Sequence, residues 1–560
     1  NVTGTSNTAV GIRAGDALTS ASECTFFGRD AGGGVTTGAN NTAIGAETMM
    51  DTVTGSDNTV VGRDGLRALT SGTHNNGLGT DSIRSVTTGS RNIGFGSRGG
   101  FNVTTGDDNV AIGYKALESE TTGHGNIAIG TEAFKQLANE SDYNVAIGYQ
   151  ALDAQATGTI TEFVAVGYRA LGAHDRNAGN SSCTALGGSS LAACTTGDRN
   201  TAVGGRSMEA CTTGSYNTAL GHSAGVGVTT GSHNIGIGAF ALQRWFGGTT
   251  GSSNIGVGNY TFNELTSGNN NTALGHQALK VNTTADNNTA VGYNCLDANT
   301  TGTATVAVGS EALTANTTGN YCTAVGRSAM SANTTGEQNT GVGSNSLDAN
   351  TTGDYNTGVG VHSLGGTTTG DNNVAVGQNA LKNNTTGYKN TSVGNSAGDN
   401  ITTGSDNVFL GNSVDGSAAD TYNEIVVGAG LTGKGANTGF LMGSVYNVQN
   451  QSSFQTTSDE RIKKNIVNNN VGLDKINQIQ IKNFEYRTPE EVDSSLPSSA
   501  AVDKNGVQLG VIAQEIQKIL PDVVREETTG CLSVNSDNLT WYLINAIKEL
   551  SAKVAALEAA

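Results

Sequence analysis

The chain has 560 residues, of which 80 are Gly and only 3 are Pro, and charged residues make up 14% of it. Its 48 acidic and 30 basic residues give a formal net charge of −18, which argues against nucleic-acid binding because phosphate-tracking surfaces need clustered Lys and Arg. The longest apolar runs stay below the roughly 18 residues that a membrane-spanning helix needs, so we expect no membrane insertion.

The first four-fifths of the chain repeat a 17-residue unit, N-T-A-[VIL]-G-x-x-A-L-x-x-N-T-T-G-x-x. The Gly that closes each short apolar triplet occurs 25 times between Gly11 and Gly428, and 20 of the 24 intervals are 17 residues long. A fixed period that tolerates insertions is typical of a solenoid. The unit is too short for a helical hairpin. It therefore predicts one coil of a parallel β-roll or β-helix, with two short strands and two turns, and coils about 4.8 Å apart.

The repeat also predicts a role for each position. We expect the fourth-position Val, Ile or Leu and the ninth-position Leu to fill the interior, and the small third-position Ala to allow close approach to another surface. Recurring Gly supplies turns with positive φ. The first-position Asn predicts a ladder that satisfies turn backbone groups and hydrogen-bonds along the stack. This ladder includes Asn41, Asn58, Asn109, Asn271, Asn339 and Asn356.

Three cysteines replace this Asn, namely Cys24, Cys183 and Cys322. Cys194 and Cys211 lie one repeat apart, so a disulfide between adjacent coils is geometrically possible, but we favour small semi-buried thiols. The sequence Asn299–Thr301 is a glycosylation sequon. Because that sequon belongs to the structural period, we favour an unmodified Asn.

One three-residue insertion carries Arg244, Trp245 and Phe246. An exposed aromatic pair beside Arg would suit contact with a host-surface receptor, a glycan among the candidates. The plainer alternative is that it covers a local gap in the roll. The other three-residue insertion, with His174–Arg176, is a weaker candidate.

The repeat resembles the head repeats of trimeric autotransporter adhesins, whose A-I-G-type coils form a left-handed β-roll. The resemblance covers residues 1–428 through the A-[VI]-G core and the downstream Gly, although those repeats are somewhat shorter, and it implies a homotrimer. The nonapeptide of calcium-binding β-rolls is absent. A β-helical hydrolase would need converging carboxylates, whereas acidic residues here are scattered, and an ice-binding face of stacked Thr is a minor alternative.

Composition changes near residue 458, since only 4 of the 80 Gly but all 3 Pro follow residue 457. We therefore expect a fibre shaft or head at residues 1–428, a neck at 429–457, and a small α+β domain at 458–560. Within this domain, residues 484–487 look like a strand. The chain ends in a helix whose apolar residues keep the alternating four/three spacing of a coiled-coil seam. They are Leu543, Ile547, Leu550, Val554 and Leu557.

The C-terminal domain carries ordered motifs: S-D-x-R-x-K-x-N-I from Ser458, F-x-Y from Phe484, G-x-I-A-Q-E-[IV] from Gly510, an L-P pair, and a final A-I-K-E-L helix. Together they resemble the intramolecular chaperone auto-processing domain of peptidase family S74, which is found at the C-termini of phage tail spikes and fibres. The resemblance covers residues 458–560.

The resemblance implies a Ser–Lys dyad, with Ser458 as nucleophile and Lys463 as base, and cleavage between Thr457 and Ser458. A Ser hydroxyl needs a nearby base to take its proton, and a Lys with a lowered pKa can serve. Other motif positions have no role that the sequence assigns, and pairing of Arg461 with Glu515 is one structural alternative. These positions are Asp459, Arg461, Gln514 and Glu515.

The sequence thus predicts a homotrimeric fibre for host attachment on a virion surface, with a self-removing chaperone and no cofactor or metal. The first residues already belong to the repeat, so we expect a virion or anchor module upstream. The alternative is an extracellular cell-surface adhesin or stalk of a bacterium or alga. A membrane-released transcription factor is disfavoured because no basic segment or transmembrane helix is visible.

Overall fold

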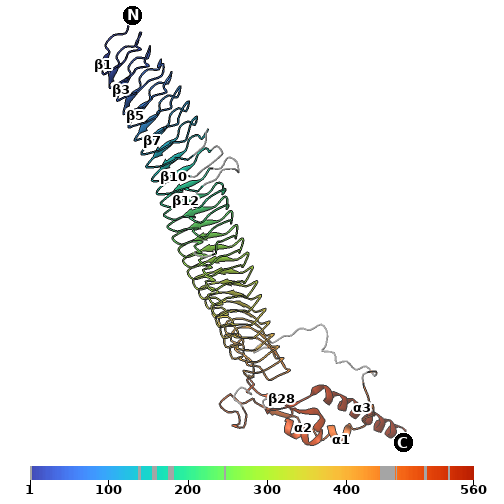
Figure 1. The fold of residues 1–560 in the computed structure, drawn as a ribbon. Coiled ribbons are helices and arrows are strands. Elements are labelled where there is room, and N and C mark those ends of the chain that lie inside the picture. The colour runs from blue at the N-terminus through green and yellow to red at the C-terminus, as the bar shows by residue number, and fades with distance from the viewer. Residues whose placement is uncertain are drawn as a thin grey trace. The chain divides into compact units, whose positions relative to one another are not determined.

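The structure, a computed structural model, describes residues 3–136, 140–153, 160–173, 182–244, 247–441, 461, 463–496, 501–502, 504–527 and 530–560. The chain divides into two compact units, Asn1–Thr352 and Gly353–Ala560, and Figure 1 shows their elements.

In the first unit, three-residue strands recur once per repeat and stack side by side into a rod (Figure 1). They are β1 (Thr8–Val10), β2 (Thr25–Phe27), β3 (Thr42–Ile44), β4 (Thr59–Val61), β5 (Asn76–Leu78), β6 (Ile93–Phe95), β7 (Val110–Ile112), β8 (Ile127–Ile129), β9 (Val145–Ile147), β10 (Val164–Val166), β11 (Thr184–Leu186), β12 (Thr201–Val203), β13 (Thr218–Leu220), β14 (Ile235–Ile237), β15 (Ile255–Val257), β16 (Thr272–Leu274), β17 (Thr289–Val291), β18 (Val306–Val308), β19 (Thr323–Val325) and β20 (Thr340–Val342).

Successive strands are parallel and in register, which confirms the predicted β-solenoid. Ala111 pairs with Ala128 across a 17-residue interval, and Ala165 pairs with Ala185 across a 20-residue interval. The longer interval therefore leaves the register of the strands unchanged. The prediction of two strands per coil was wrong in the described coils, because the A-L positions lie in a turn that follows the strand.

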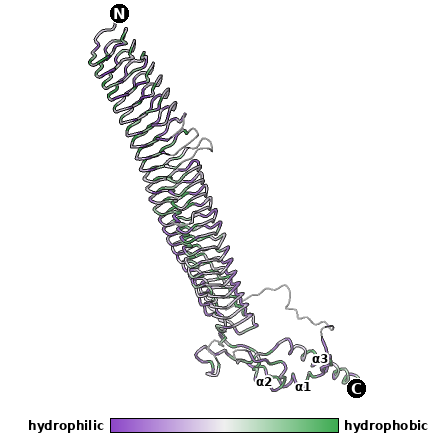
Figure 2. The backbone as a smooth tube through the Cα atoms, viewed as in Figure 1, coloured by the Kyte–Doolittle hydropathy of each residue, from purple (hydrophilic) through white to green (hydrophobic). Residues whose placement is uncertain are grey.

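The predicted interior was also wrong at two positions. The third-position Ala is buried, as at Ala43 and Ala185, whereas the fourth-position Leu186 and Leu220 are 45% and 46% exposed. Side chains alternate along a strand, so in a three-residue strand only the central one faces inward. The ninth-position Leu packs inside as expected. Figure 2 shows the resulting mixture of apolar and polar positions around each coil.

A large third-position residue fits the narrow interior where Gly replaces the usual Leu at neighbouring ninth positions. Phe26 is fully buried, and the ninth positions of its own and the preceding coil are Gly32 and Gly15. Both have φ of +62°, and a Cβ on Gly32 would lie 2.5 Å from the Phe26 ring. Since such a contact is impossible, these glycines make room for the ring.

The Asn ladder forms as predicted. Asn58 donates from Nδ2 to Asn41 Oδ1 at 3.1 Å and to the Gly72 carbonyl at 3.0 Å, and its backbone N–H donates to the same Asn41 oxygen at 3.0 Å. Each buried amide thus bridges two coils and a turn, which meets the requirement that buried polar groups be paired.

Recurring Gly serves both conformation and close approach. Gly45 has φ of +129°, and a Cβ there would lie 2.4 Å from the Gly62 carbonyl oxygen of the next coil. At the turn after the Thr pair, a Cβ on Gly38 would lie 2.0 Å from the Gly55 carbonyl oxygen. Any side chain at either column would therefore force adjacent coils apart.

None of the seven cysteines forms a disulfide, as we favoured, but those in the solenoid are fully buried and not semi-buried. Cys183 and Cys194 both donate to the Gly197 carbonyl at 3.5 Å. The sequon residue Asn299 is 0% exposed, and its Nδ2 donates to Asn282 Oδ1 and to the Gly302 carbonyl at 3.0 Å each. Its amide nitrogen is thus inaccessible to a glycosylating enzyme in the folded coil.

The second unit begins with further coils of the same repeat. Their strands are β21 (Thr357–Val359), β22 (Val374–Val376), β23 (Thr391–Val393), β24 (Val408–Leu410), β25 (Ile425–Val427) and β26 (Gly439–Leu441). Because β26 pairs with β25, the ladder extends into the segment that we expected to be a neck. Glu424 stands at the Asn position and accepts from the N–H groups of Ser417 and Gly435 at 2.9 and 2.8 Å.

The C-terminal region is α+β, as predicted. Its elements are α1 (Leu473–Ile476), β27 (Lys482–Phe484), β28 (Gln508–Gly510), α2 (Ala513–Ile519), η3 (Pro521–Val523), β29 (Val524–Glu526), β30 (Leu532–Val534) and α3 (Ser536–Glu558). β27 pairs antiparallel with β28, and β29 with β30. The strand expected at 484–487 instead ends at Phe484.

Candidate processing site and surface grooves

The C-terminal region has a small hydrophobic core that holds its helices together. Ile516 of α2, Leu520, Val523 and Tyr542 of α3 form it, with Ile476 of α1 packed against them. Tyr542 also donates its hydroxyl to Asp522 Oδ2 at 2.5 Å, and this hydrogen bond raises the pKa of Tyr542. The core therefore joins α2, η3 and α3.

The predicted dyad is only partly within the described residues. Lys463 is described and exposed, as is Arg461. Ser458, Thr457 and Asp459 lie outside the described residues. The Ser–Lys geometry therefore stays a prediction.

The stretch after Lys463 is bound to the terminal helix α3. Asn545 donates from Nδ2 to the Asn469 carbonyl at 2.7 Å, and Asn469 donates from its own Nδ2 to the Tyr542 hydroxyl at 3.4 Å. The Leu473 N–H donates to Glu549 Oε2 at 3.2 Å. Sequence reasoning missed Asn545 and Glu549, because single polar residues on the face of a helix carry no motif.

Gln514 and Glu515 both lie in the first turn of α2. Glu515 forms an ion pair with Lys482 of β27, so it links the helix to the adjacent hairpin. Gln514 lines a mostly apolar cavity of about 780 Å³ together with Phe484 and Ile512. Pairing of Arg461 with Glu515 stays a prediction.

α3 presents an apolar seam that the described chain leaves uncovered. Ile547 is 63% exposed, and the other seam residues are also exposed, whereas Tyr542 and Ala546 of the same helix are buried. The predicted seam residues Leu543, Ile547, Leu550, Val554 and Leu557 therefore lie on a helix, and they are exposed to solvent.

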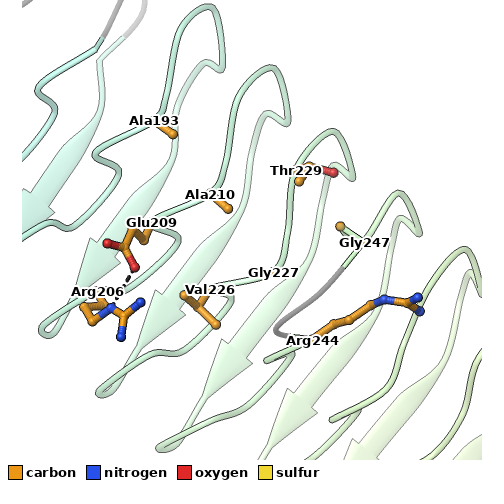
Figure 3. A pocket seen from close by; sticks show the side chains of 10 residues that line it. Ala193, Arg206, Glu209, Ala210, Val226, Gly227, Thr229, Arg244 and Gly247 are labelled. Atoms are coloured by element: carbon orange, nitrogen blue, oxygen red, sulfur yellow. Dashed lines mark hydrogen bonds and ion pairs between the residues drawn. The ribbon is translucent and has the colours of Figure 1, made fainter.

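Arg244 lies beside a surface groove of about 490 Å³ on the solenoid, shown in Figure 3. Ala193, Ala210 and Val226 line the groove, and an ion pair from Arg206 Nε to Glu209 Oε2 at 2.7 Å lies along it. Trp245, Phe246 and His174–Arg176 lie outside the described residues, so their predicted receptor contact is untested.

Among the described residues, no group of three or more His, Cys, Asp or Glu side chains is placed to hold a metal ion. In the same part of the chain, none of the helices has the length and hydrophobicity needed to cross a membrane.

Fold and site define a long β-solenoid protein with a small α+β C-terminal domain. A family model described as Peptidase_S74, chaperone of endosialidase, matches residues 458–525. The chain therefore carries a C-terminal peptidase S74 chaperone domain after a fibrous solenoid. The matched range includes the positions of Ser458, Lys463, Gln514 and Glu515.

Proposed function

We propose that this chain forms a homotrimeric virion fibre for host attachment, whose C-terminal domain directs trimerisation and folding and then cuts between Thr457 and Ser458. The observation that carries this proposal is the peptidase S74 match that begins at residue 458, C-terminal to a long solenoid whose last described strand ends at Leu441. The description of this family as a peptidase and a chaperone supports the folding and self-cleavage parts of the proposal.

In the proposed reaction, Lys463 Nζ takes the proton of Ser458 Oγ, and this oxygen attacks the carbonyl carbon of Thr457. The peptide C–N bond breaks, an ester forms on Ser458 Oγ, and the Ser458 nitrogen leaves with the proton as an amine. Water then hydrolyses the ester, which leaves a Thr457 carboxylate and a free Ser458 hydroxyl. The reaction is one intramolecular turnover.

The base must be neutral, and burial favours a neutral Lys. In the described single chain Lys463 is exposed. We therefore infer that assembly covers Lys463, so that cutting follows trimer formation. This order would keep the chaperone attached until the fibre has formed.

Two uncovered apolar surfaces support self-association. One is the α3 seam. The other is the outer face of the solenoid sheet, where fourth-position residues such as Leu186, Leu220 and Leu274 are exposed. Contiguous exposed apolar surfaces of this kind are typical of interaction sites.

The repeat also explains the need for a chaperone. Because successive coils are nearly equivalent, chains could pair in many wrong registers, and long-range parallel pairing is slow. A domain that trimerises first would fix the register at one end. Removing it afterwards would leave the fibre kinetically trapped.

Sedimentation of the purified full chain and immunogold labelling of virions test this proposal. We expect a trimer, label on virion fibres, and competition by the purified fibre for host attachment. A monomer would contradict the trimer. Labelling of a cell surface instead of virions would favour the alternative, a cell-surface adhesin or stalk.

A further inference from the structure

A second groove, of about 460 Å³, lies on the outer surface of the coils that carry β14, β15 and β16. It adjoins Arg244 in sequence but is separate from the groove in Figure 3, since no lining residue is shared. Its lining residues are Phe240, Gln243, Tyr260, Asn263, Gln277 and Lys280.

One wall of this groove belongs to an aromatic ladder over five consecutive coils. Phe240 and Tyr260 stack with ring centroids 5.0 Å apart, and Tyr260 meets His276 edge-on at 6.1 Å. The ladder continues to His222 on one side and to Tyr293 on the other. The wall is therefore aromatic. Because Tyr260 is 36% exposed, it can be reached from solvent.

The other wall is polar but nearly neutral. Gln243 is only 3% exposed and lines this wall, and its side-chain amide can both donate and accept hydrogen bonds. Asn263 donates to Glu264 Oε1 at 3.1 Å, which leaves its carbonyl oxygen available as an acceptor. The one cation that lines the groove, Lys280, acts on the nearby Asp297 carboxyl, whose pKa burial raises and Lys280 lowers.

We propose that this groove binds a neutral oligosaccharide chain. A pyranose ring offers apolar C–H faces to an aromatic wall, and its hydroxyl groups both donate and accept, which matches amides with both capacities. Phe240 and Tyr260 occupy the same repeat position in adjacent coils, so two successive sugars would each meet an aromatic ring. Anionic ligands are disfavoured because the groove has a single cation beside a carboxyl group.

A polypeptide occupant is disfavoured by the backbone. An extended peptide binds by adding to a free strand edge, whereas the strands here, β14 to β16, are paired on both sides. The proposal deepens the proposed attachment function by naming the site and class of receptor. Its chemistry, however, is testable without any host.

The test is binding of the full-length chain to an array of neutral oligosaccharides, acidic oligosaccharides and peptides, followed by titration of the best ligand. We expect neutral oligosaccharides to bind, Tyr260→Ala and Gln243→Glu to weaken binding roughly tenfold or more, and Tyr260→Phe to retain most of the affinity. Tyr114→Ala, at an exposed Tyr in a distant coil, is the matched control. Circular dichroism of each variant checks folding.

Binding to peptides or acidic sugars alone, or neutral-sugar binding that Tyr260→Ala leaves unchanged, would overturn the inference. Attachment to host cells without any oligosaccharide binding would also overturn it while sparing the proposed function. If the chain binds neutral oligosaccharides but virions do not use it to attach to host cells, the inference about the groove would stand and the proposed attachment function would be contradicted.

Discussion

Asn545 of α3 donates its side-chain N–H to the backbone carbonyl of Asn469 at 2.7 Å, a few residues after Lys463. This bond connects the predicted catalytic segment to the helix that carries the exposed apolar seam. Assembly through α3 would therefore also position the stretch that follows the base.

Replacing Asn545 with Ala should slow self-cleavage several-fold without abolishing it, because the catalytic groups remain but their segment is less well held. The rate of appearance of the shorter product on a denaturing gel measures this. Lys553→Ala, at an exposed residue of the same helix, is the control and should cut at the wild-type rate. Equal rates for both variants would exclude a positioning role for Asn545.

The α3 seam is predicted to hold the trimer together. Ile547→Asp places a charge on the exposed seam, and burying an unpaired charge in an interface costs several kcal/mol. We expect the variant to sediment as a monomer and to remain uncut. A trimer of normal stability would show that other surfaces are sufficient for assembly.

Each Asn of the ladder is predicted to stabilise its own coil and the next one. In Asn109→Ala, the Asn126 backbone N–H loses its acceptor, Asn109 Oδ1, now at 3.0 Å, which should cost about 1–3 kcal/mol locally. Hydrogen exchange at the Asn126 amide should accelerate accordingly. Asn76→Ala, at an exposed strand position, should leave exchange in neighbouring coils nearly unchanged.

Stability should increase as pH falls from 7.5 to 5. Burial raises the pKa of Asp153 to about 6, and burial together with Asp399 raises the pKa of Asp415 to about 6. A raised carboxyl pKa means that the folded state binds the proton more tightly, so this stabilisation is complete below about pH 4 and is lost as pH rises through about 6. Thermal unfolding should show Tm higher by about 1–3 °C at pH 5. Asp415→Asn should reduce the dependence, and an unchanged slope would contradict it.

The repeat period predicted the solenoid, its register and the Asn ladder, because these depend only on equivalent residues stacking. It did not predict which side of the strand faces inward, since Ala at the third position and Leu at the fourth can each be read as interior. Ala185 is buried and Leu186 is exposed, because side chains alternate along the strand and the central one of the three faces inward. Which face of the strand is turned inward depends on the path of the whole coil, and the sequence of one strand does not reveal that path.

The candidate site, too, could be predicted only in part from the sequence. The S-D-x-R-x-K motif identified the peptidase S74 domain, because the residues of that motif are close in sequence. The contact of Asn469 with Asn545 joins positions far apart in the chain, and the groove at Gln243 requires three coils to be aligned. Neither leaves a local pattern in the sequence.

The most direct test of the central claim is intact mass and N-terminal sequencing of the purified full chain, with Ser458→Ala and Lys463→Ala in parallel. The account predicts that the wild type splits into two fragments, the second beginning at Ser458, and that both variants remain whole. A wild-type chain that stays intact as a folded trimer, or a Ser458→Ala variant that still splits after residue 457, would contradict it.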